Sequence, residues 1–213
     1  SFTESIPASW IKETNKKLNI TYRALDKDIY SFEIPSYTQT QTLIIDPNPT
    51  IEWGTYYGSG DEYGYGISCD TYGNVLVTGC TGSTTGIATS GAHQDTLASI
   101  QDAFVIKFNS NGVRQWGTYY GGSLWDEGWG ISCDADGNVF VTGFTLSSTG
   151  IATSGAHQET HAGQYDAFVV KFNTNGARQW GTYYGGSEYD YGDGIFCDAG
   201  GNVFVTGWTE SPN

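Results

Sequence analysis

The sequence predicts an all-β protein built from β-propeller blades, and three observations support this prediction. Three stretches are near-copies of one another, and their first tryptophans, Trp53, Trp116 and Trp180, lie 63 and 64 residues apart. Each copy alternates apolar and polar residues in short runs that are separated by turn residues, a pattern typical of antiparallel strands. The chain also contains 30 glycines and 15 tyrosines but no methionine, a composition typical of β-structure. A fixed long period indicates units that bury their apolar faces against one another.

The second copy shows the four expected strands of one blade most clearly. Its first strand is expected at residues 129–133, and the next five residues form a turn whose Gly and Asn tolerate positive φ. The second strand is expected at residues 139–144. A long connection leads to the third strand at residues 167–172, and a short turn leads to the fourth at residues 178–184. Four short antiparallel strands joined in this way make one propeller blade.

The same pattern divides residues 51–213 into about two and a half blades. The blades are expected at about residues 58–120, 121–184 and, as a partial blade, 185–213. Residues 51–57 match the fourth strand of a preceding blade. Because a closed propeller needs four to eight blades, we expect further blades, either from a longer polypeptide, which we favour, or from other copies of the chain.

Residues 1–50 differ in composition and are expected to form a small β-rich segment before the repeats. Within it, residues 18–25 and 28–34 alternate like the two arms of a hairpin, and residues 42–45 form a further apolar run. A short helix is expected after Ser9.

The charge of the chain excludes several classes of partner. Its net charge is −14, and residues 1–50 are nearly neutral, so the repeats carry almost all of it. Such a surface repels the phosphates of nucleic acids and anionic membranes. No run of 18 apolar residues occurs, so no segment is predicted to enter a membrane.

The cysteines are predicted to be free thiols. Cys69, Cys133 and Cys197 are repeat equivalents, whereas Cys80 is not. Equivalent positions on packed sheets lie ~10 Å apart, whereas a disulfide needs Cα atoms within about 7 Å. We therefore expect buried thiols that behave as small apolar groups.

Several motifs resemble one known family. The stretches WGTYYGG, GNVFVTG, SGAHQ and DAFVVKFN resemble the bacterial SBBP-type β-propeller repeat, and IPASW, ITYRAL, YSFEI and LIIDP resemble the β-rich region that often precedes it. The resemblance implies a secreted or surface-displayed protein and no general enzymatic activity. Cys80 and Asp193 depart from the aromatic residues at their repeat equivalents, so local packing should differ there.

One turn is a candidate metal site. Asp134, Asp136 and Asn138 have the alternating oxygen spacing that begins a calcium loop, although the distal Glu of an EF-hand is missing. The interpretation that we favour is a hairpin turn in which an aspartate caps backbone N–H groups. Calcium is the only cofactor that the sequence suggests.

The other charged residues predict structural roles. Acidic residues precede the first strand of every blade (Asp61 and Glu62; Asp126 and Glu127; Glu188 and Asp190). A glycosidase needs one asymmetric pair of carboxylates, so this replication favours structural ligation or solvated loops over catalysis. The cations of the repeats are expected to form cross-strand ion pairs with acids that include Asp102 and Asp166, each pair worth at most about 1 kcal/mol if exposed (Lys107, Lys171, Arg114, Arg178).

The histidines and aromatic residues complete the candidates. His93 and His157 lie in identical stretches and are expected to bind their own ordered loops, whereas the unmatched His161 is expected to be exposed. Trp116 is expected to pack between blades with its aromatic neighbours. Trp125 is the aromatic most expected to be exposed, and it is the candidate ligand-binding residue because aromatic faces can stack on sugar rings.

These observations predict a non-catalytic extracellular or cell-surface β-propeller module that serves as a binding or structural scaffold in adhesion or assembly. Its expected partners are a protein or glycan at the cell surface, or further blades or copies of itself. The alternative is a glycan-binding propeller. A polysaccharide lyase or glycosidase whose site lies outside this segment is less favoured.

Overall fold

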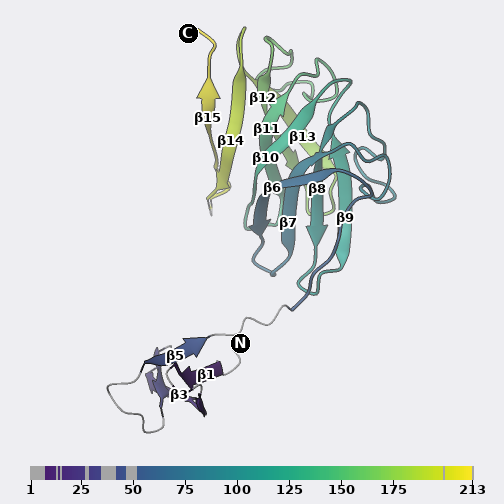
Figure 1. Ribbon diagram of the computed structural model, residues 1–213. Coiled ribbons are helices and arrows are strands. Elements are labelled where there is room, and N and C mark those ends of the chain that lie inside the picture. Colours follow the sequence, from purple (N-terminus) through teal and green to yellow (C-terminus); the bar gives the residue numbers. More distant parts are fainter. Residues whose placement is uncertain are drawn as a thin grey trace. The chain divides into compact units, whose positions relative to one another are not determined.

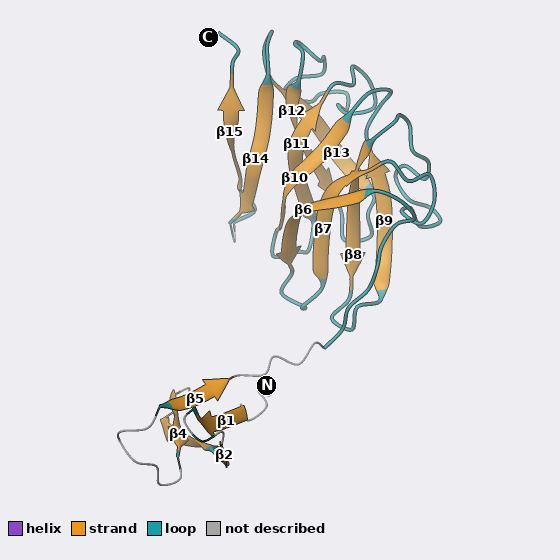
Figure 2. Ribbon diagram, in the orientation of Figure 1, coloured by secondary structure: helices purple, strands orange, loops and turns teal. Residues whose placement is uncertain are grey.

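The computed structural model describes residues 8–12, 14, 16–26, 29–34, 42–46, 52–198 and 200–212. The chain divides into two compact units, Ser1–Glu52 and Trp53–Asn213, and each is described here by itself. Every regular element of the described residues is a β-strand (Figure 2), which confirms the predicted all-β class.

The first unit contains a three-stranded sheet and a hairpin. The sheet has the order β2-β1-β5 and is antiparallel, with strands β1 (Ala8–Ile11), β2 (Lys16–Leu18) and β5 (Leu43–Asp46). The hairpin pairs β3 (Thr21–Asp26) with β4 (Ile29–Glu33), as the alternating pattern predicted. The helix predicted after Ser9 is wrong, because these residues form β1 and Ser9 pairs with Ile45. An aromatic and a β-branched residue follow Ser9, and both favour a strand.

The second unit contains the predicted blades (Figure 1). The first blade is an antiparallel sheet in chain order, formed by β6 (Glu62–Cys69), β7 (Val75–Thr81), β8 (Asp102–Phe108) and β9 (Arg114–Tyr120). The second has the same order, formed by β10 (Asp126–Cys133), β11 (Val139–Thr145), β12 (Asp166–Phe172) and β13 (Arg178–Tyr184). The third consists of the pair β14 (Asp190–Cys197) and β15 (Val203–Thr209).

The first strand of every blade is longer than predicted because it passes through a β-bulge. In blade 2 the pairing register shifts between Gly128 and Gly130, and Trp129 is the extra residue. The same shift occurs between Gly64 and Gly66 in blade 1 and between the equivalent glycines of blade 3. The Gly-x-Gly pattern resembles a break in the strand, but a bulge lets the strand continue with one residue unpaired.

Adjacent blades pack face to face, and an apolar core lies between blades 1 and 2. Strand β10 contacts β6, β7 and β8, and β14 contacts β10, β11 and β12. The core between blades 1 and 2 contains side chains from both sheets (Leu76, Val105, Trp116 and Tyr120 from blade 1; Val141, Phe168, Val170 and Phe172 from blade 2). Trp116 is 7% exposed and Tyr120 is fully buried, which confirms the prediction that Trp116 packs between blades.

The strand predicted at residues 51–57 is not formed by the described residues 52–57. Trp53 and Tyr57 nevertheless lie against blade 1, where they contact the Phe104 and Phe108 rings of β8 at centroid distances of 5.9–6.0 Å. None of the described strands pairs with this segment, so it makes the side-chain contacts of a fourth strand without the hydrogen-bond ladder.

Candidate functional site

The turn proposed as a calcium loop is closed by its own hydrogen bonds. Asp134 Oδ1 accepts from the backbone N–H groups of Asp136 and Asn138 at 3.1 and 2.8 Å, and Asp134 Oδ2 accepts from the Asn138 side-chain amide at 2.8 Å. The Asp136 side chain is exposed. The same hydrogen bonds recur at Asp70 and Asp198. This geometry is that of an aspartate-capped turn, and calcium at this turn stays a prediction.

A lysine of the third strand extends this turn network in each complete blade. Lys107 Nζ lies 2.9 Å from Asp70 Oδ2, and both side chains are buried, whereas the equivalent Lys171–Asp134 pair is 3.9 Å apart and more exposed. Burial acts to raise the pKa of Asp70, but hydrogen bonds from Asn74 and Lys107 outweigh it and hold the pKa below its ordinary value. The predicted ion pairing is therefore confirmed for Lys107 and Lys171, and the turn of blade 1 buries the first pair.

The two arginines bind carbonyl groups rather than acids. Arg114 Nη1 donates to the Gly86 carbonyl at 2.9 Å, and Arg178 makes the equivalent bond to Gly150 at 2.9 Å. Among the described residues neither arginine forms an ion pair, so the predicted cross-strand pairing is wrong for both. Each arginine instead fixes the start of the long connection of its blade.

A second hydrogen-bond network surrounds the acidic residue at the start of each blade. In blade 2, Asp126 accepts hydrogen bonds from the Thr145 hydroxyl, from the Ser147 hydroxyl at 2.9 Å and from the Gly122 backbone N–H at 2.8 Å. Asp190 repeats all three contacts in blade 3, and Glu62 replaces the aspartate in blade 1. A repeated Thr-x-Ser pattern at the end of the second strand carries these hydroxyls, and its role was not predicted from the sequence.

The two aspartates at this position differ in the direction of their pKa shifts. Burial and, to a smaller extent, the nearby Asp102 carboxylate raise the pKa of Asp126 to about 7, although three hydrogen bonds act in the opposite direction. Burial also acts to raise the pKa of Asp190, but there the hydrogen bonds prevail and the pKa is lowered. The sheet that contains Asp126 has four strands, whereas the described part of blade 3, which contains Asp190, has two.

Asp102 and Asp166 anchor the long connections rather than form ion pairs. Both side chains are fully buried. Asp102 accepts from the Ala98 N–H at 2.8 Å, the Ser99 hydroxyl at 3.0 Å and the Gln94 amide at 2.7 Å. Asp166 accepts from Ala162 and from the equivalent glutamine. The expectation that these acids pair with cations is therefore wrong.

The histidines have three different environments. His93 lies between blades, with its ring 6.1 Å from Tyr120 and 5.9 Å from Phe172, rather than bound within its own loop. Burial lowers the pKa of His93 to about 4, and the charge of Arg178 adds to this effect. His157 is exposed and stacks on Tyr184. His161 is half-buried, with Nε2 3.2 Å from the Thr145 carbonyl, so its predicted exposure is wrong.

The four cysteines are free thiols, as predicted, but their burial differs. Cys80 and Cys197 are buried, Cys133 is half-buried and Cys69 is exposed. The Cys133 thiol donates to the Cys69 carbonyl at 3.4 Å, so the first strands of adjacent blades are in direct contact here. Cys69 is exposed because no described blade packs on the outer side of β6.

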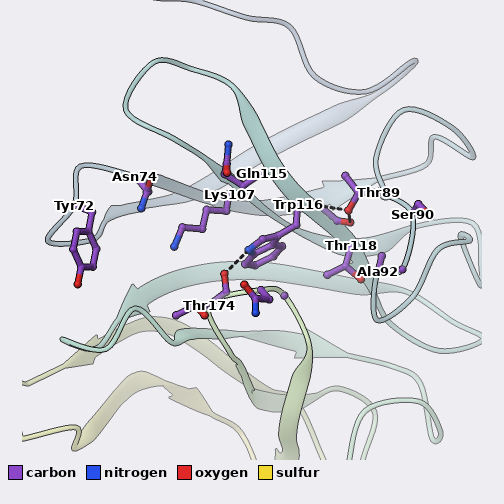
Figure 3. A pocket seen from close by; sticks show the side chains of 14 residues that line it. Tyr72, Asn74, Thr89, Ser90, Ala92, Lys107, Gln115, Trp116, Thr118 and Thr174 are labelled. Carbon is purple, nitrogen blue, oxygen red and sulfur yellow. Dashed lines mark hydrogen bonds between the residues drawn. The ribbon is translucent and has the colours of Figure 1, made fainter.

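A groove of about 580 Å³ lies between blades 1 and 2 (Figure 3). Trp116 lies at its centre, and its indole Nε1 donates to the Thr174 carbonyl at 2.9 Å. Lys107 and Asn74 also line the groove, and both bind Asp70. These side chains already have partners within the blades, so the groove follows from blade packing and presents no cluster of unsatisfied groups.

Trp125 lies at a hollow that is separate from this groove and has a volume of about 330 Å³. The Trp125 side chain is 47% exposed, as predicted, and its indole Nε1 donates to Gln101 Oε1 at 2.9 Å. Gln101 in turn donates to Glu127 at 2.9 Å, so the orientation of the ring is fixed from blade 1. The rest of the hollow is lined by small and apolar residues (Ser99, Ile100, Ser123, Leu124, Leu146). These neighbours were not predicted from the sequence because they come from separate loops.

Two features are absent from the part of the chain that the structure describes. No three or more histidine, cysteine or acidic side chains gather closely enough to hold a metal ion. No described helix has the length and apolar character needed to cross a membrane.

Comparisons with known proteins agree with the blades. The family model described as SBBP, beta-propeller repeat, matches residues 179–212. No curated protein matches the chain significantly. The matched residues run from the fourth strand of blade 2 through β14 and β15, and the equivalent strands recur in the preceding blades. Residues 179–212 are therefore an SBBP-type β-propeller repeat, and the blades before them share its strand pattern.

Proposed function

We propose that this chain is a non-catalytic, extracellular or cell-surface β-propeller module that serves as a binding or structural scaffold in adhesion or assembly. The observation that carries this proposal is the repeated hydrogen bonding of its buried carboxylates. A general acid or base must reach the proton that it transfers. Asp126 is fully buried and bound to hydroxyl and N–H groups of its own blade, and Asp190 repeats this arrangement.

The exposed apolar surface supports a role in binding. Among the described residues, Trp180 is 36% exposed, Tyr184 65%, Phe204 55% and Trp208 46%, and all four lie on strands β13 and β15. Large exposed aromatic side chains favour an interaction surface. The net charge of −14 disfavours nucleic-acid partners, so a protein or glycan partner, or further blades, fits better.

The extracellular location rests on the resemblance of the repeat motifs, and it has a direct test. Antibodies against the purified chain should label intact cells of the source organism before permeabilisation. Labelling that appears only after permeabilisation would contradict the surface location. An antibody against an internal protein of the same cells controls for leakage.

The absence of catalysis is tested separately with polysaccharides. Incubation of the chain with a panel of acidic and neutral polysaccharides should release neither unsaturated sugars nor reducing ends. Product release that scales with protein concentration would support a lyase or glycosidase instead.

Glycan binding is the second candidate function, and the hollow at Trp125 favours it. The exposed indole ring is held by its hydrogen bond to Gln101, and a fixed aromatic face suits the apolar face of a sugar ring. A glycan array should then show binding that Trp125→Ala abolishes and Tyr56→Ala, a fully exposed control, leaves unchanged. Equal glycan binding by the two variants would exclude the hollow at Trp125 as the binding site.

A further inference from the structure

We propose that the hollow at Trp125 is a docking site for a polypeptide partner that inserts one large apolar side chain flanked by lysine or arginine residues. This inference rests on the proposed scaffold function and names the chemistry of the partner. The hollow has a volume of about 330 Å³. Such a volume lies at the lower end of the range for ligand pockets, about 300–1,000 Å³, so it suits a single side chain rather than a whole strand or helix.

The apolar side chains of the hollow are exposed on loops of two blades. Ile100 lies in the long connection of blade 1 and is 87% exposed. Leu124 and Trp125 lie just before β10 and are 52% and 47% exposed, and Leu146 follows β11. Because all four line one hollow, they form a continuous apolar surface rather than scattered exposed side chains. Such a surface favours an interaction site.

The next blade repeats the backbone of this hollow. The Leu146 N–H donates to the Trp125 carbonyl at 2.9 Å, and the Glu210 N–H donates to the Tyr189 carbonyl at 2.8 Å. A second hydrogen bond, from the N–H of the residue before each of these aromatic rings to a serine hydroxyl, also recurs, at 2.9 and 3.0 Å. The two places therefore differ in their side chains and not in their backbone framework.

On this shared backbone the next blade carries polar side chains. The residues of the hollow and their equivalents are Ile100 and Gln164, Leu124 and Glu188, and Leu146 and Glu210. In blade 1 the position equivalent to Leu146 holds a glycine, Gly82. A residue type that the blade needed for folding would recur at every blade. The propeller fold therefore gives no reason for the exposed apolar set at this one place.

The hollow suits an apolar side chain better than a sugar ring. Ser99, the polar side chain that blade 1 contributes to the lining, already has partners, because its Oγ lies 3.0 Å from both the Gln101 carbonyl oxygen and Asp102 Oδ1. The Trp125 indole N–H is bound to the Gln101 side chain. Ser123 is then the remaining polar side chain of the lining. A sugar would bury hydroxyl groups without enough partners, which is costly, whereas an aliphatic or aromatic side chain has no such need.

The charge of the repeats favours a basic partner. Residues 51–213 contain 17 acidic and four basic residues. Each of the four cations is held within its own blade, two by aspartates and two by backbone carbonyls. Glu127 lies beside the hollow, because Gln101 joins its carboxylate to the Trp125 indole through hydrogen bonds of 2.9 Å each. Lysine or arginine residues beside the inserted side chain complement this negative surface.

The test selects ligands from a phage-displayed library of random short peptides, with the whole chain as the immobilised receptor. A triple variant with Ile100→Gln, Leu124→Glu and Leu146→Glu is added in excess as a soluble competitor, which removes peptides that bind elsewhere. The next blade carries these side chains on the same backbone, so we expect the variant to fold, and circular dichroism checks this. The single variant Leu124→Glu, at an exposed position, replaces it if it unfolds. The enriched peptides should share one large apolar residue flanked by lysine or arginine.

Fluorescence anisotropy of one enriched peptide then measures the contribution of the hollow. The Kd should rise at least about tenfold for the triple variant, and also when serine replaces the apolar residue of the peptide. The triple variant has two additional carboxylates, which attract a basic peptide, so its loss of affinity reports the lost apolar contact. Added salt should also raise the Kd, because it screens the charges. Tyr56→Ala, a fully exposed position outside the hollow, is the control and should bind like the wild type.

Equal affinity for the wild type and the triple variant, no enrichment, or enriched peptides without a shared apolar residue would overturn the proposal. Glycan-array binding that the triple variant loses, without any enriched peptide, would identify a sugar as the occupant and would also overturn it. These outcomes are independent of the surface location and of catalysis. Failed cell labelling or product release would therefore refute the proposed function while peptide binding persisted.

Discussion

Trp116 of blade 1 lies against Phe172 of blade 2, with their ring centroids 6.3 Å apart. The indole is also held by a hydrogen bond to the turn that follows β12. The fourth strand of one blade therefore covers the third strand of the next blade, and Trp53 repeats this contact with Phe108 of blade 1. This relationship explains why a WGTYY motif stands before each of the three blades.

The bulge in the first strand of blade 2 predicts that Gly143 cannot be replaced by a larger residue without loss of stability. A methyl group at this position would overlap the Glu127 carbonyl oxygen, because the two backbones meet closely beside the bulge. Gly143→Ala should therefore destabilise the chain by several kcal/mol, comparable to an overpacked core. Gly54→Ala is the control, since nothing lies within 4 Å of its added methyl group. Chemical denaturation of both variants checks this, and equal stabilities would contradict the bulge geometry.

The two lysine–aspartate pairs should differ in their importance for stability. Lys107→Met leaves the buried Asp70 carboxylate without its charged partner, and such a loss costs about 3–5 kcal/mol. Lys171→Met should cost less, because its pair is longer and more exposed to solvent. Urea denaturation at neutral pH measures both losses. A larger loss of stability for Lys171→Met than for Lys107→Met would contradict the stronger burial of the Lys107–Asp70 pair.

The environments of Asp126 and Asp190 predict opposite dependences on pH. The pKa of Asp126 is raised to about 7, so the folded state binds its proton more tightly than the unfolded state does. Its contribution to stability is complete below about pH 4 and is lost as the pH rises through 7. The stability of the wild type relative to Asp126→Asn should therefore fall with rising pH, by at most about 1.4 kcal/mol per pH unit.

Asp190 serves as the matched control in the same experiment. Its pKa is lowered, so its contribution is present above about pH 4 and is lost as the pH falls through the folded-state pKa. The stability of the wild type relative to Asp190→Asn should then stay constant between pH 5 and 8. Denaturation curves across this range measure both differences. A flat profile for Asp126→Asn would contradict its raised pKa.

The repeat made most of the blade architecture predictable from the sequence. The alternating runs at residues 139–144 and 167–172 lie within β11 and β12, because these strands have regular pairing and two buried faces. The bulge at Trp129 was missed, because glycines on both sides of a residue look like the end of a strand. The predicted strand at residues 51–57 was wrong. A strand forms only where another strand is available to pair with it, and the local sequence pattern does not show whether one is.

The candidate site was less predictable, because its geometry depends on loops that are distant in the sequence. The exposure of Trp125 followed from its position between motifs, but its hydrogen bond to Gln101 joins two blades. Likewise, the burial of Asp126 depends on hydroxyl groups about twenty residues away, at Thr145 and Ser147. Residue type alone therefore indicated acidic loops, whereas the fold makes these carboxylates part of the blade interior.

The central claim is that the fourth strand of each blade is stabilised by the third strand of the next. The paired variants Trp116→Ala and Trp180→Ala test it most directly, because they change the same residue at the same repeat position. Trp116 is covered by Phe172, whereas Trp180 has no such cover among the described residues. The account predicts that Trp116→Ala lowers the free energy of unfolding by about 3–5 kcal/mol and that Trp180→Ala lowers it by less than half as much. Equal losses for the two variants would contradict the account.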